Sequence, residues 1–386
     1  MDLNALLRNA VDLGGSDIHL KLGRPPILRR DGHVAPMDGW PELGESDLTS
    51  ALETVAGFAP AKLASFHATG ELDIAYTGAG LPRMRVNGFR QRGSISFAFR
   101  VIPDQVPTFA ELRMPPGVAR LAENHRGLVL VTGASGAGKT TTLAAMLDYV
   151  NRTRRQHIVT VEDPIEILHA DIQCIVNQRE VGLDTESFHQ ALRRLLRQDP
   201  DVILIGELRD AETAETALQA AESGHLVFST LHTIDAMETI GRLVEFFPAE
   251  KQQQVRSILS GVLRGVISQR LLPRIAGGRV AAVEVMVANA RISDLIRDHK
   301  TNEIPKAIAE GSFLDMQTFS QSLIELVLNG EVERDIAAAA ATNAHDFVVT
   351  LEHALKAHRI RAEAEEEAQP EERPMSGLRL GTFFEE

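Results

Sequence analysis

A glycine-rich segment between Gly133 and Thr140, with the sequence GASGAGKT, has the residue types and spacing of a phosphate-binding loop. Glycines let backbone amides approach a phosphate closely, and a following helix start adds its positive end. The lysine would hold the β and γ phosphates of ATP, and the hydroxyl after it would ligate Mg²⁺. The alternative is a glycine-rich turn that binds nothing. The residues assigned to nucleotide binding are Gly133, Ser135, Gly136, Ala137, Gly138, Lys139, Thr140 and Thr141, with Lys139 also assigned to catalysis and Thr140 to Mg²⁺.

Carboxylates follow two apolar segments that we expect to be buried strands. Val202–Ile205 ends in Gly206-Glu207, and the carboxyl edge of an open α/β sheet is where ligands lie. Glu207 is therefore expected to orient or deprotonate an attacking water. Ile158–Val161 is followed by Glu162 and Asp163, which are expected to act in catalysis and in nucleotide binding, respectively. The alternative is that these acids cap the next helix.

Histidines and arginines complete the candidate site. His225 and His232 bracket a third apolar segment with hydroxylated neighbours, which suits recognition of a γ phosphate by hydrogen bonds. His232 is assigned to catalysis and His225 to nucleotide binding, with packing as the alternative. Arg85 and Arg100 lie on expected strands of the first hundred residues. They could neutralise charge on the γ phosphate across a domain or subunit boundary, or could be salt-bridged strand residues.

The elements that must position these groups alternate between apolar strands and helical segments, as in a mostly parallel sheet covered by helices. The segment GASGAGKT follows the first of these strands and opens a helix expected over Thr141–Val150. A last section, from about residue 252 to 344, is expected to be mainly helical from its Leu, Ile and Val spacing. The expected strands are Leu128–Val131, Ile158–Val161, Val202–Ile205 and Leu226–Phe228.

The chain is expected to contain two domains, a linker and a tail. Residues 1–102 indicate a small α+β domain, with an alternating strand at Ser16–Leu22, a helix at Glu45–Phe58 and a hairpin around Arg92-Gly93. Four prolines within a short span predict a linker at 103–117. The catalytic domain is expected at 118–347. Residues 348–386 are expected to form an acidic, disordered tail, because 361–386 holds eight acidic residues against three arginines.

Composition restricts the classes of function. A net charge of −13 argues against a protein whose main role is to wrap a nucleic-acid duplex. The single cysteine, Cys174, excludes an intramolecular disulfide and a multi-cysteine zinc cluster, and fits a reducing cytosol. Met1–Ala10 lacks the pattern of a signal peptide, and no uncharged apolar run is long enough to span a bilayer. Membrane contact, if any, is therefore expected through partners and not by direct insertion.

Taken together, these motifs resemble the PilT-type retraction ATPases of type IV pili, within the secretion ATPase superfamily. The likeness extends from the amino terminus to about Phe347. The blocks that carry it are Gly15–Leu20, the phosphate-binding loop continued through Asp148, the aspartate box at Glu162–Glu166, Asn177–Val181, the Walker B segment at Asp199–Asp210 and the histidine box at Gly224–Thr233.

The branch within the superfamily is indicated by fewer residues. The four-cysteine insertion and longer amino-terminal region of assembly and secretion members are absent, whereas Gly311–Leu323 is similar to the retraction branch. The carboxyl-side motif of that branch, AIRNLIRE, is matched only in part. Its matching residues are Ile292, Leu295, Ile296 and Arg297, and its departures are Ser293, Asp294 and Asp298.

The resemblance implies a PAS-like α+β N-terminal domain followed by a RecA-like P-loop ATPase domain with a helical C-terminal section. It also implies a homohexameric ring, docked on the cytoplasmic face of an inner-membrane pilus platform protein, in which ATP hydrolysis powers retraction and twitching motility. The alternatives are an assembly or secretion ATPase that drives extension, a nucleic-acid motor, and a nucleotide-binding subunit without turnover. The acidic composition opposes a nucleic-acid partner, and the presence of Glu207 opposes a subunit without turnover.

Overall fold

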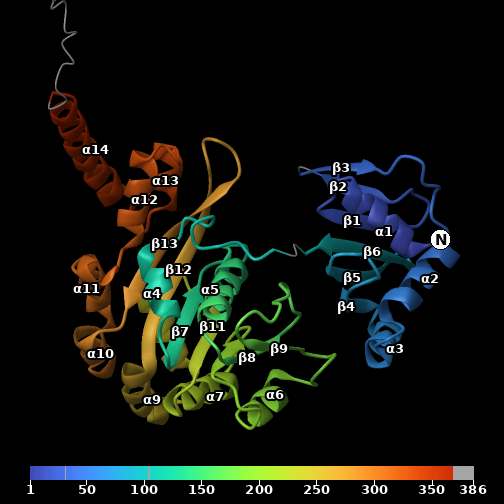
Figure 1. Ribbon diagram of the computed structural model, residues 1–386, viewed down its shortest axis with the longest axis horizontal. Coiled ribbons are helices and arrows are strands. Elements are labelled where there is room, and N and C mark those ends of the chain that lie inside the picture. The colour runs from blue at the N-terminus through green and yellow to red at the C-terminus, as the bar shows by residue number, and fades with distance from the viewer. Residues whose placement is uncertain (31, 103–104, 368–386) are drawn as a thin grey trace, which may run out of the picture.

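The computed structural model describes residues 1–30, 32–102 and 105–367 (Figure 1). These residues form a six-stranded sheet at the amino-terminal end and a seven-stranded sheet in the following domain. Helices alternate with the strands of the larger sheet, and a helical section follows it. The predicted α/β fold, with an N-terminal sheet domain, a mostly parallel second sheet covered by helices, and carboxyl-terminal helices, is confirmed.

The N-terminal domain is an antiparallel sheet in the order β3-β2-β1-β6-β5-β4, with its helices packed on it (Figure 1). Phe66, Phe97 and Phe99 are fully buried in its core. Its elements are α1 (Leu3–Asp12), β1 (Asp17–Lys21), β2 (Ile27–Arg30), β3 (His33–Pro36), α2 (Glu45–Ala56), α3 (Pro60–Thr69), β4 (Glu71–Tyr76), β5 (Met84–Gln91) and β6 (Ser94–Val101).

The β5–β6 hairpin decides where two of the predicted site residues lie. Its turn is formed by Arg92 and Gly93, both with positive φ, as a two-residue hairpin turn requires. The resulting register places Arg85 directly opposite Arg100. Because cross-strand partners point to the same face of a sheet, the two arginines lie side by side.

The larger sheet has the order β13-β12-β7-β11-β10-β8-β9, and only the β12–β13 pair is antiparallel. Its central strands are buried on both faces, which explains their continuous apolar sequences. The elements of this domain are α4 (Pro116–Ala122), β7 (Gly127–Thr132), α5 (Lys139–Thr153), β8 (His157–Glu162), β9 (Ile175–Glu180), α6 (Phe188–Leu195), β10 (Val202–Ile205), α7 (Ala211–Glu222), β11 (Leu226–Leu231), α8 (Ala236–Glu245), α9 (Ala249–Val262), β12 (Leu263–Pro273) and β13 (Arg279–Val287).

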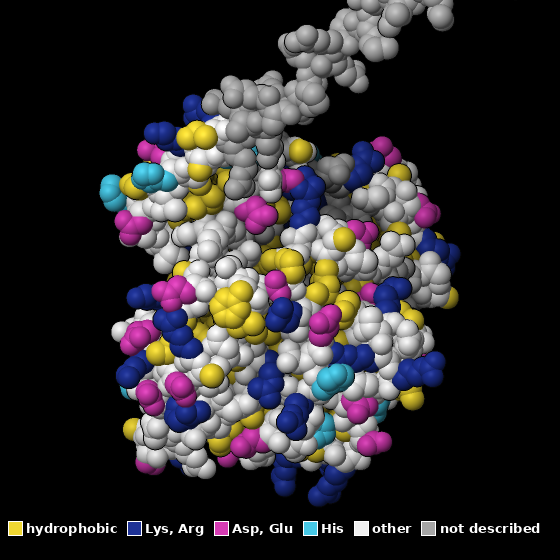
Figure 2. All heavy atoms as spheres, turned by 60° about the vertical axis from the view of Figure 1, so that its left-hand side comes forward, with side chains coloured by type: hydrophobic (Ala, Val, Ile, Leu, Met, Phe, Trp, Pro, Cys, Tyr) yellow, Lys and Arg dark blue, Asp and Glu magenta, His cyan; other side chains and the backbone are white. Residues whose placement is uncertain are grey.

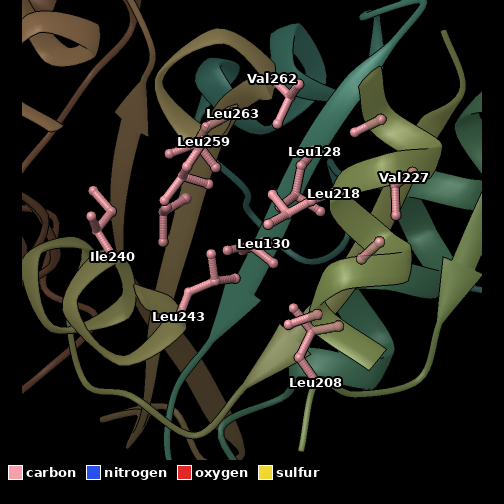
Figure 3. Close-up of a cluster of buried hydrophobic side chains, with 14 of the residues drawn as sticks. Leu128, Leu130, Leu208, Leu218, Val227, Ile240, Leu243, Leu259, Val262 and Leu263 are labelled. Carbon is pink, nitrogen blue, oxygen red and sulfur yellow. The ribbon is translucent and has the colours of Figure 1, made fainter. Parts of the chain in front are cut away.

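One apolar cluster fixes helices α7, α8 and α9 on the sheet (Figure 3). Leu128 and Leu130 of β7 lie at its centre, between Leu218 of α7 and the α8 and α9 side chains such as Leu243 and Leu259. All five are at most 3% exposed. Truncation of such a side chain to alanine typically lowers the free energy of unfolding by about 2–5 kcal/mol. This cluster therefore holds the strand that leads into the phosphate-binding loop.

The last three helices pack on the β12–β13 hairpin through Leu272, Val280, Phe319, Phe347 and Leu351. The carboxyl-terminal elements are α10 (Ala290–Arg297), the 3₁₀ turn η1 (Thr301–Glu303), α11 (Ile304–Ala309), the 3₁₀ turn η2 (Ser312–Leu314), α12 (Phe319–Leu328), α13 (Arg334–Ala340) and α14 (Ala344–Glu367).

Two boundary predictions are wrong. The section 252–344 is largely helical as predicted, but β12 and β13 interrupt it and occupy most of 263–287. The predicted linker ends too late, since α4 begins at Pro116. The predicted disordered tail begins too early, because residues 348–367 continue α14 and Leu351 is buried against α12 and α13. The remainder of the predicted tail, residues 368–386, lies outside the described residues.

The surface is mixed in charge. Figure 2 shows lysine and arginine side chains interspersed with acidic ones on the face that includes the carboxyl-terminal helices.

Among the described residues, no helix has the length and apolar content that crossing a bilayer would require.

Candidate nucleotide site

The glycine-rich loop lies between the end of β7 at Thr132 and the start of α5 at Lys139. Gly133, Gly136 and Gly138 have φ values of 143°, 79° and 90°, which side chains rarely adopt. A Cβ atom on Gly133 would also lie 2.5 Å from the Gln269 carbonyl oxygen. The loop therefore needs glycine, and it presents the amino end of a 15-residue helix to the site.

Lys139 is the first residue of α5 and is mostly buried. Its Nζ donates to the carbonyl oxygens of Gly133 at 2.8 Å and Ala134 at 3.1 Å, and lies 3.5 Å from Nδ1 of His232. Burial lowers the pKa of Lys139, and the carboxylates of Glu207 and Glu166 act in the opposite direction. The ammonium group is thus held within the curve of the loop, beside the acids.

A cavity of about 670 Å³ lies over the loop and receives side chains from both domains. Most of the predicted site residues line it. These are Arg85, Arg100, Ser135, Gly136, Gly138, Lys139, Thr140, Thr141, Glu162, Asp163, Glu207 and His232. Gly133 and Ala137 instead line a smaller adjoining cavity of about 290 Å³ between the loop and β12.

Glu207 follows β10 at the carboxyl edge of the sheet and is held by Arg209 and His232. It forms an ion pair with Arg209, and its Oε2 lies 3.4 Å from Nε2 of His232. Arg209 also lies 4.0 Å from a carboxylate oxygen of Asp163. Partial burial acts to raise the pKa of Glu207, but Arg209 and His232 outweigh it, so this pKa lies below its usual value. Glu207 is therefore ionised at neutral pH.

Glu162 ends the neighbouring strand β8 in a different environment. Its Oε1 accepts hydrogen bonds from Thr160 Oγ1 at 2.7 Å and from Gln178 Nε2 at 3.2 Å. Burial raises the pKa of Glu162, and these two donors oppose the shift. The two glutamates at the site thus differ in their tendency to hold a proton.

Arg85 and Arg100 reach the cavity from the N-terminal domain. Arg85 pairs with Asp73 at 2.8 Å and with Glu166 at 3.5 Å. Arg100 pairs with Asp17 at 2.9 Å, although its own side chain is 72% exposed. The ion pairs considered as the alternative are therefore present, and both guanidinium groups also line the cavity.

His225, which was assigned to nucleotide binding, does not line the cavity with the other predicted residues. It precedes β11, and its Nδ1 lies 2.9 Å from the carbonyl oxygen of Ala220. His232 follows the same strand, and a strand of this length separates the two histidines by roughly 20 Å. Residues that bracket one strand must lie at opposite edges of the sheet, and only His232 is at the ligand edge.

Sequence reasoning missed several residues that line the cavity. Arg209 was not assigned to the site, although it lies two residues after Glu207 and pairs with it. Arg279 begins β13, in the section that was predicted to be helical. The Gly277-Gly278 pair, a strong turn signal, could have indicated this hairpin. Within the described ranges, no group of three or more His, Cys, Asp or Glu side chains is arranged to hold a metal ion.

Comparison with known proteins shows the family. Residues 110–277 match the family described as type II/IV secretion system protein. The type IV pilus retraction ATPase PilT of Pseudomonas aeruginosa is 46% identical over 347 residues, which cover 90% of this chain and all of that protein. The type IV pilus ATPase PilU of the same organism is 40% identical over 349 residues, covering 90% of each chain.

Solved structures agree with this relationship. The crystal structure of the pilus retraction motor PilT with bound ADP matches with a TM-score of 0.83 and 44% identity, covering 90% of this chain and 98% of that one. The ATPase DotB of Legionella pneumophila matches with a TM-score of 0.77 and 27% identity, covering 87% of this chain and 93% of that one. The chain therefore belongs to the PilT-type family of pilus retraction ATPases and is a nucleotide-binding P-loop enzyme that hydrolyses ATP.

Proposed function

We propose that this chain hydrolyses ATP in the cavity over the glycine-rich loop and uses the energy to retract a type IV pilus. One observation carries the proposal: Lys139, Glu207 and two arginines of the other domain line a single cavity. A simple nucleotide-binding subunit needs the loop alone. The additional acid and the guanidinium groups supply what hydrolysis requires.

The phosphate-binding roles follow from the loop geometry. Backbone amides of the loop and the Lys139 ammonium would bind the β and γ phosphates, and the Thr140 hydroxyl would ligate Mg²⁺. The residues present fit this metal, because Mg²⁺ usually takes few protein ligands and relies on phosphate oxygens and water. Its chemical contribution would be to neutralise charge on the phosphates.

The hydrolytic step needs a water molecule in line with the γ phosphorus. Glu207, ionised and held by Arg209 and His232, would accept its proton as the oxygen attacks. The bond between the γ phosphorus and the bridging oxygen breaks, and ADP and phosphate leave. Arg85 and Arg100 would neutralise the charge that accumulates on the transferring group. Glu162 and Asp163 would contact the γ phosphate and its water shell.

The nucleoside would occupy a second cavity of about 600 Å³ that shares Arg85, Arg100, Thr140 and Thr141 with the first. The chain segment between the domains lines it with Val106 and Pro107, and the end of β6 adds apolar side chains. Apolar walls beside a phosphate site suit a purine base. Nucleotide would thus contact both domains at once.

The whole motor is proposed to act as a homohexameric ring at the cytoplasmic face of the inner membrane, bound to a pilus platform protein. The family membership of the chain and its 46% sequence identity to PilT of Pseudomonas aeruginosa support this assignment. The AIRNLIRE motif of the retraction branch, which this chain matches in part, lies on α10. Its matching residues Ile292, Leu295 and Ile296 are buried. Asp294 and Asp298, two of the departures, are exposed, so they change the surface and not the packing.

The function is tested by removing the gene from its own host and following individual pili by fluorescence microscopy. Retraction should stop while pilus extension continues, and the wild-type gene should restore it. Loss of extension instead would favour the assembly role, and unchanged pili would exclude both.

Replacement of Lys139 by alanine tests the site itself. The variant should lose Mg²⁺-dependent ATP hydrolysis, because the phosphate charge is then uncompensated. Phosphate release by the purified protein is the measurement. An exposed lysine far from the loop, Lys251, provides the matched control in Lys251→Ala. Wild-type turnover in Lys139→Ala would show that hydrolysis occurs elsewhere.

A further inference from the structure

An ion pair joins the N-terminal domain to the end of β9, the strand that pairs with β8. Arg83, just before β5, donates from Nη2 to Oε2 of Glu180 at 2.5 Å. The two side chains are only 14% and 1% exposed. The Arg83 Nε also lies 3.4 Å from the carbonyl oxygen of Ile165. The Arg83–Glu180 pair is therefore largely buried, unlike the Arg85–Glu166 pair, whose side chains are 39% and 44% exposed.

Glu180 does not line the nucleotide site itself, but it holds the segment that does. It ends β9 and lies opposite Glu162 in the parallel β8–β9 pair. Its Oε2 accepts the backbone N–H of Ile165 at 3.2 Å, so it fixes the chain between Glu162 and Glu166. A buried carboxylate needs a cation nearby, and here that cation comes from the other domain.

Arg83 is also coupled to the two arginines at the cavity. Its carbonyl oxygen accepts the N–H of Ile102 at 2.9 Å, which joins it to the end of β6. Arg85 lies two residues further along the chain, in β5, and directly opposite Arg100. Residues two apart point to the same face of a strand. The position of Arg83 therefore affects where the sheet face that carries Arg85 and Arg100 lies relative to the nucleotide cavity.

A second contact lies at the same boundary. The loop after β9 lies beside the N-terminal domain (Figure 1), and a Cβ atom on Gly182 would meet Nζ and Cε of Lys62 in α3 at 2.8 Å. The domain therefore contacts the β8–β9 region at several points, of which the Arg83–Glu180 pair is the buried ion pair.

We propose that the Arg83–Glu180 pair is a latch that holds the N-terminal domain where Arg85 and Arg100 face the phosphates, which makes Arg83 a positioning residue. The proposal rests on the proposed function, because the latch matters to turnover only if those arginines act on ATP. Release of the pair lets the domain turn away and takes both arginines with it. Glu180 keeps its bond to Ile165 and stays with the ATPase domain.

The test compares Arg83→Met with the double variant Arg83→Met/Glu180→Gln. Methionine keeps the apolar stem of arginine, and glutamine keeps the acceptor for the Ile165 N–H. The double variant contains no unpaired buried charge, so it should fold even where the single variant does not. Arg24→Met is the matched control, because Arg24 is an exposed arginine of the same domain.

Two measurements are made on each full-length variant. The first is the distance between spin labels at Glu53→Cys in α2 and Lys251→Cys in α9, in a Cys174→Ala background, with labelled chain diluted in unlabelled chain. The second is the kcat and KM for ATP. We expect both latch variants to broaden and shift the distance distribution and to lower kcat by about 10²-fold, with a much smaller change in KM. Arg24→Met should change neither.

A purely structural role predicts a different result, namely that the double variant recovers the wild-type distance distribution and kcat. That recovery, or a wild-type distance distribution in folded Arg83→Met, would overturn the latch. The distance measurement needs no turnover. Failure of the proposed function, seen as absent hydrolysis by the wild-type protein, is therefore distinguished from failure of the latch.

Discussion

Glu162 and Glu207 end neighbouring strands, yet their surroundings shift their proton affinities in opposite directions. Burial raises the pKa of Glu162, whereas Arg209 and His232 outweigh burial at Glu207 and lower its pKa. Environments that separate the pKa values of two carboxyl groups commonly divide their roles. We therefore infer that Glu207 is the base and that Glu162 contributes hydrogen bonds near the γ phosphate.

Replacing Glu207 by glutamine should preserve ATP binding and lower turnover by about 10²-fold or more, because an amide keeps the shape but cannot accept a proton. Binding is measured by titration with a fluorescent ATP analogue, and turnover by phosphate release. Glu212→Gln, on the exposed face of α7, is a control. Weak binding together with normal turnover would contradict the base role.

Arg85→Ala and Arg100→Ala should each lower turnover while ATP affinity and folding change little, because a guanidinium group on the transferring phosphoryl acts mainly in the transition state. Steady-state kinetics and thermal unfolding measure the two effects. The ion pairs with Asp73 and Asp17 are partly exposed and are each expected to contribute at most about 1 kcal/mol to stability. Unchanged turnover, or unfolding alone, would leave both arginines as simple strand residues.

At the scale of elements, the β12–β13 hairpin contributes more than the sequence indicated. Glu284 of β13 is buried, and it accepts the N–H of Ala236 at the start of α8 at 2.9 Å. The turn before α8 carries His232, so this bond helps to fix the histidine. Asp235 of the same turn and Arg270 of β12 are the charged groups that face Glu284.

Glu284 should make stability depend on pH. Burial raises its pKa from 4.5 to about 7, with Asp235 adding to this and Arg270 opposing it. Between these values the folded state binds more protons than the unfolded state. Unfolding free energy should therefore fall as pH rises through this window, by up to about 3 kcal/mol.

Glu284→Gln keeps the acceptor for Ala236 and removes the titration. The difference in thermal midpoint between variant and wild type should therefore favour the variant more at pH 8 than at pH 5. Differential scanning calorimetry measures this difference. A difference that is the same at both pH values would show that Glu284 does not titrate in this range.

How well the sequence predicted an element depended on its surroundings. Val202–Ile205 was predicted and found with the same bounds, since an apolar run between turn residues has few alternatives. The β12 strand is also apolar, but a strand buried on both faces lacks alternation, and its spacing can mimic a helix. The Arg83–Glu180 contact spans 97 residues, so local patterns could not reveal it. His225 lies away from the cavity for a geometric reason, because strand direction decides which end of a strand meets the ligand edge.

At the scale of the whole molecule, we expect six chains to form a ring with nucleotide held where rigid units meet. Multi-angle light scattering in the presence of ATP and Mg²⁺ should then give about 250 kDa, six times the 42.2 kDa of one chain. Hydrolysis could alter the angle between such units, which would drive motion. A mass of one chain at micromolar protein would count heavily against this arrangement.

The β12–β13 hairpin also determines how stiffly the carboxyl-terminal helices are attached. β12 pairs with β7 only as far as Ser268, whereas its pairing with β13 continues to Pro273. A two-stranded ribbon bends and twists more readily than a broad sheet. The ribbon beyond Ser268 therefore acts as an elastic joint, and thermal bending of the helices that pack on Leu272 and Val280 is concentrated there. The phosphate-binding loop lies beside the base of this ribbon, with Gly133 close to the Gln269 carbonyl, so bending of the helices would be felt at the loop.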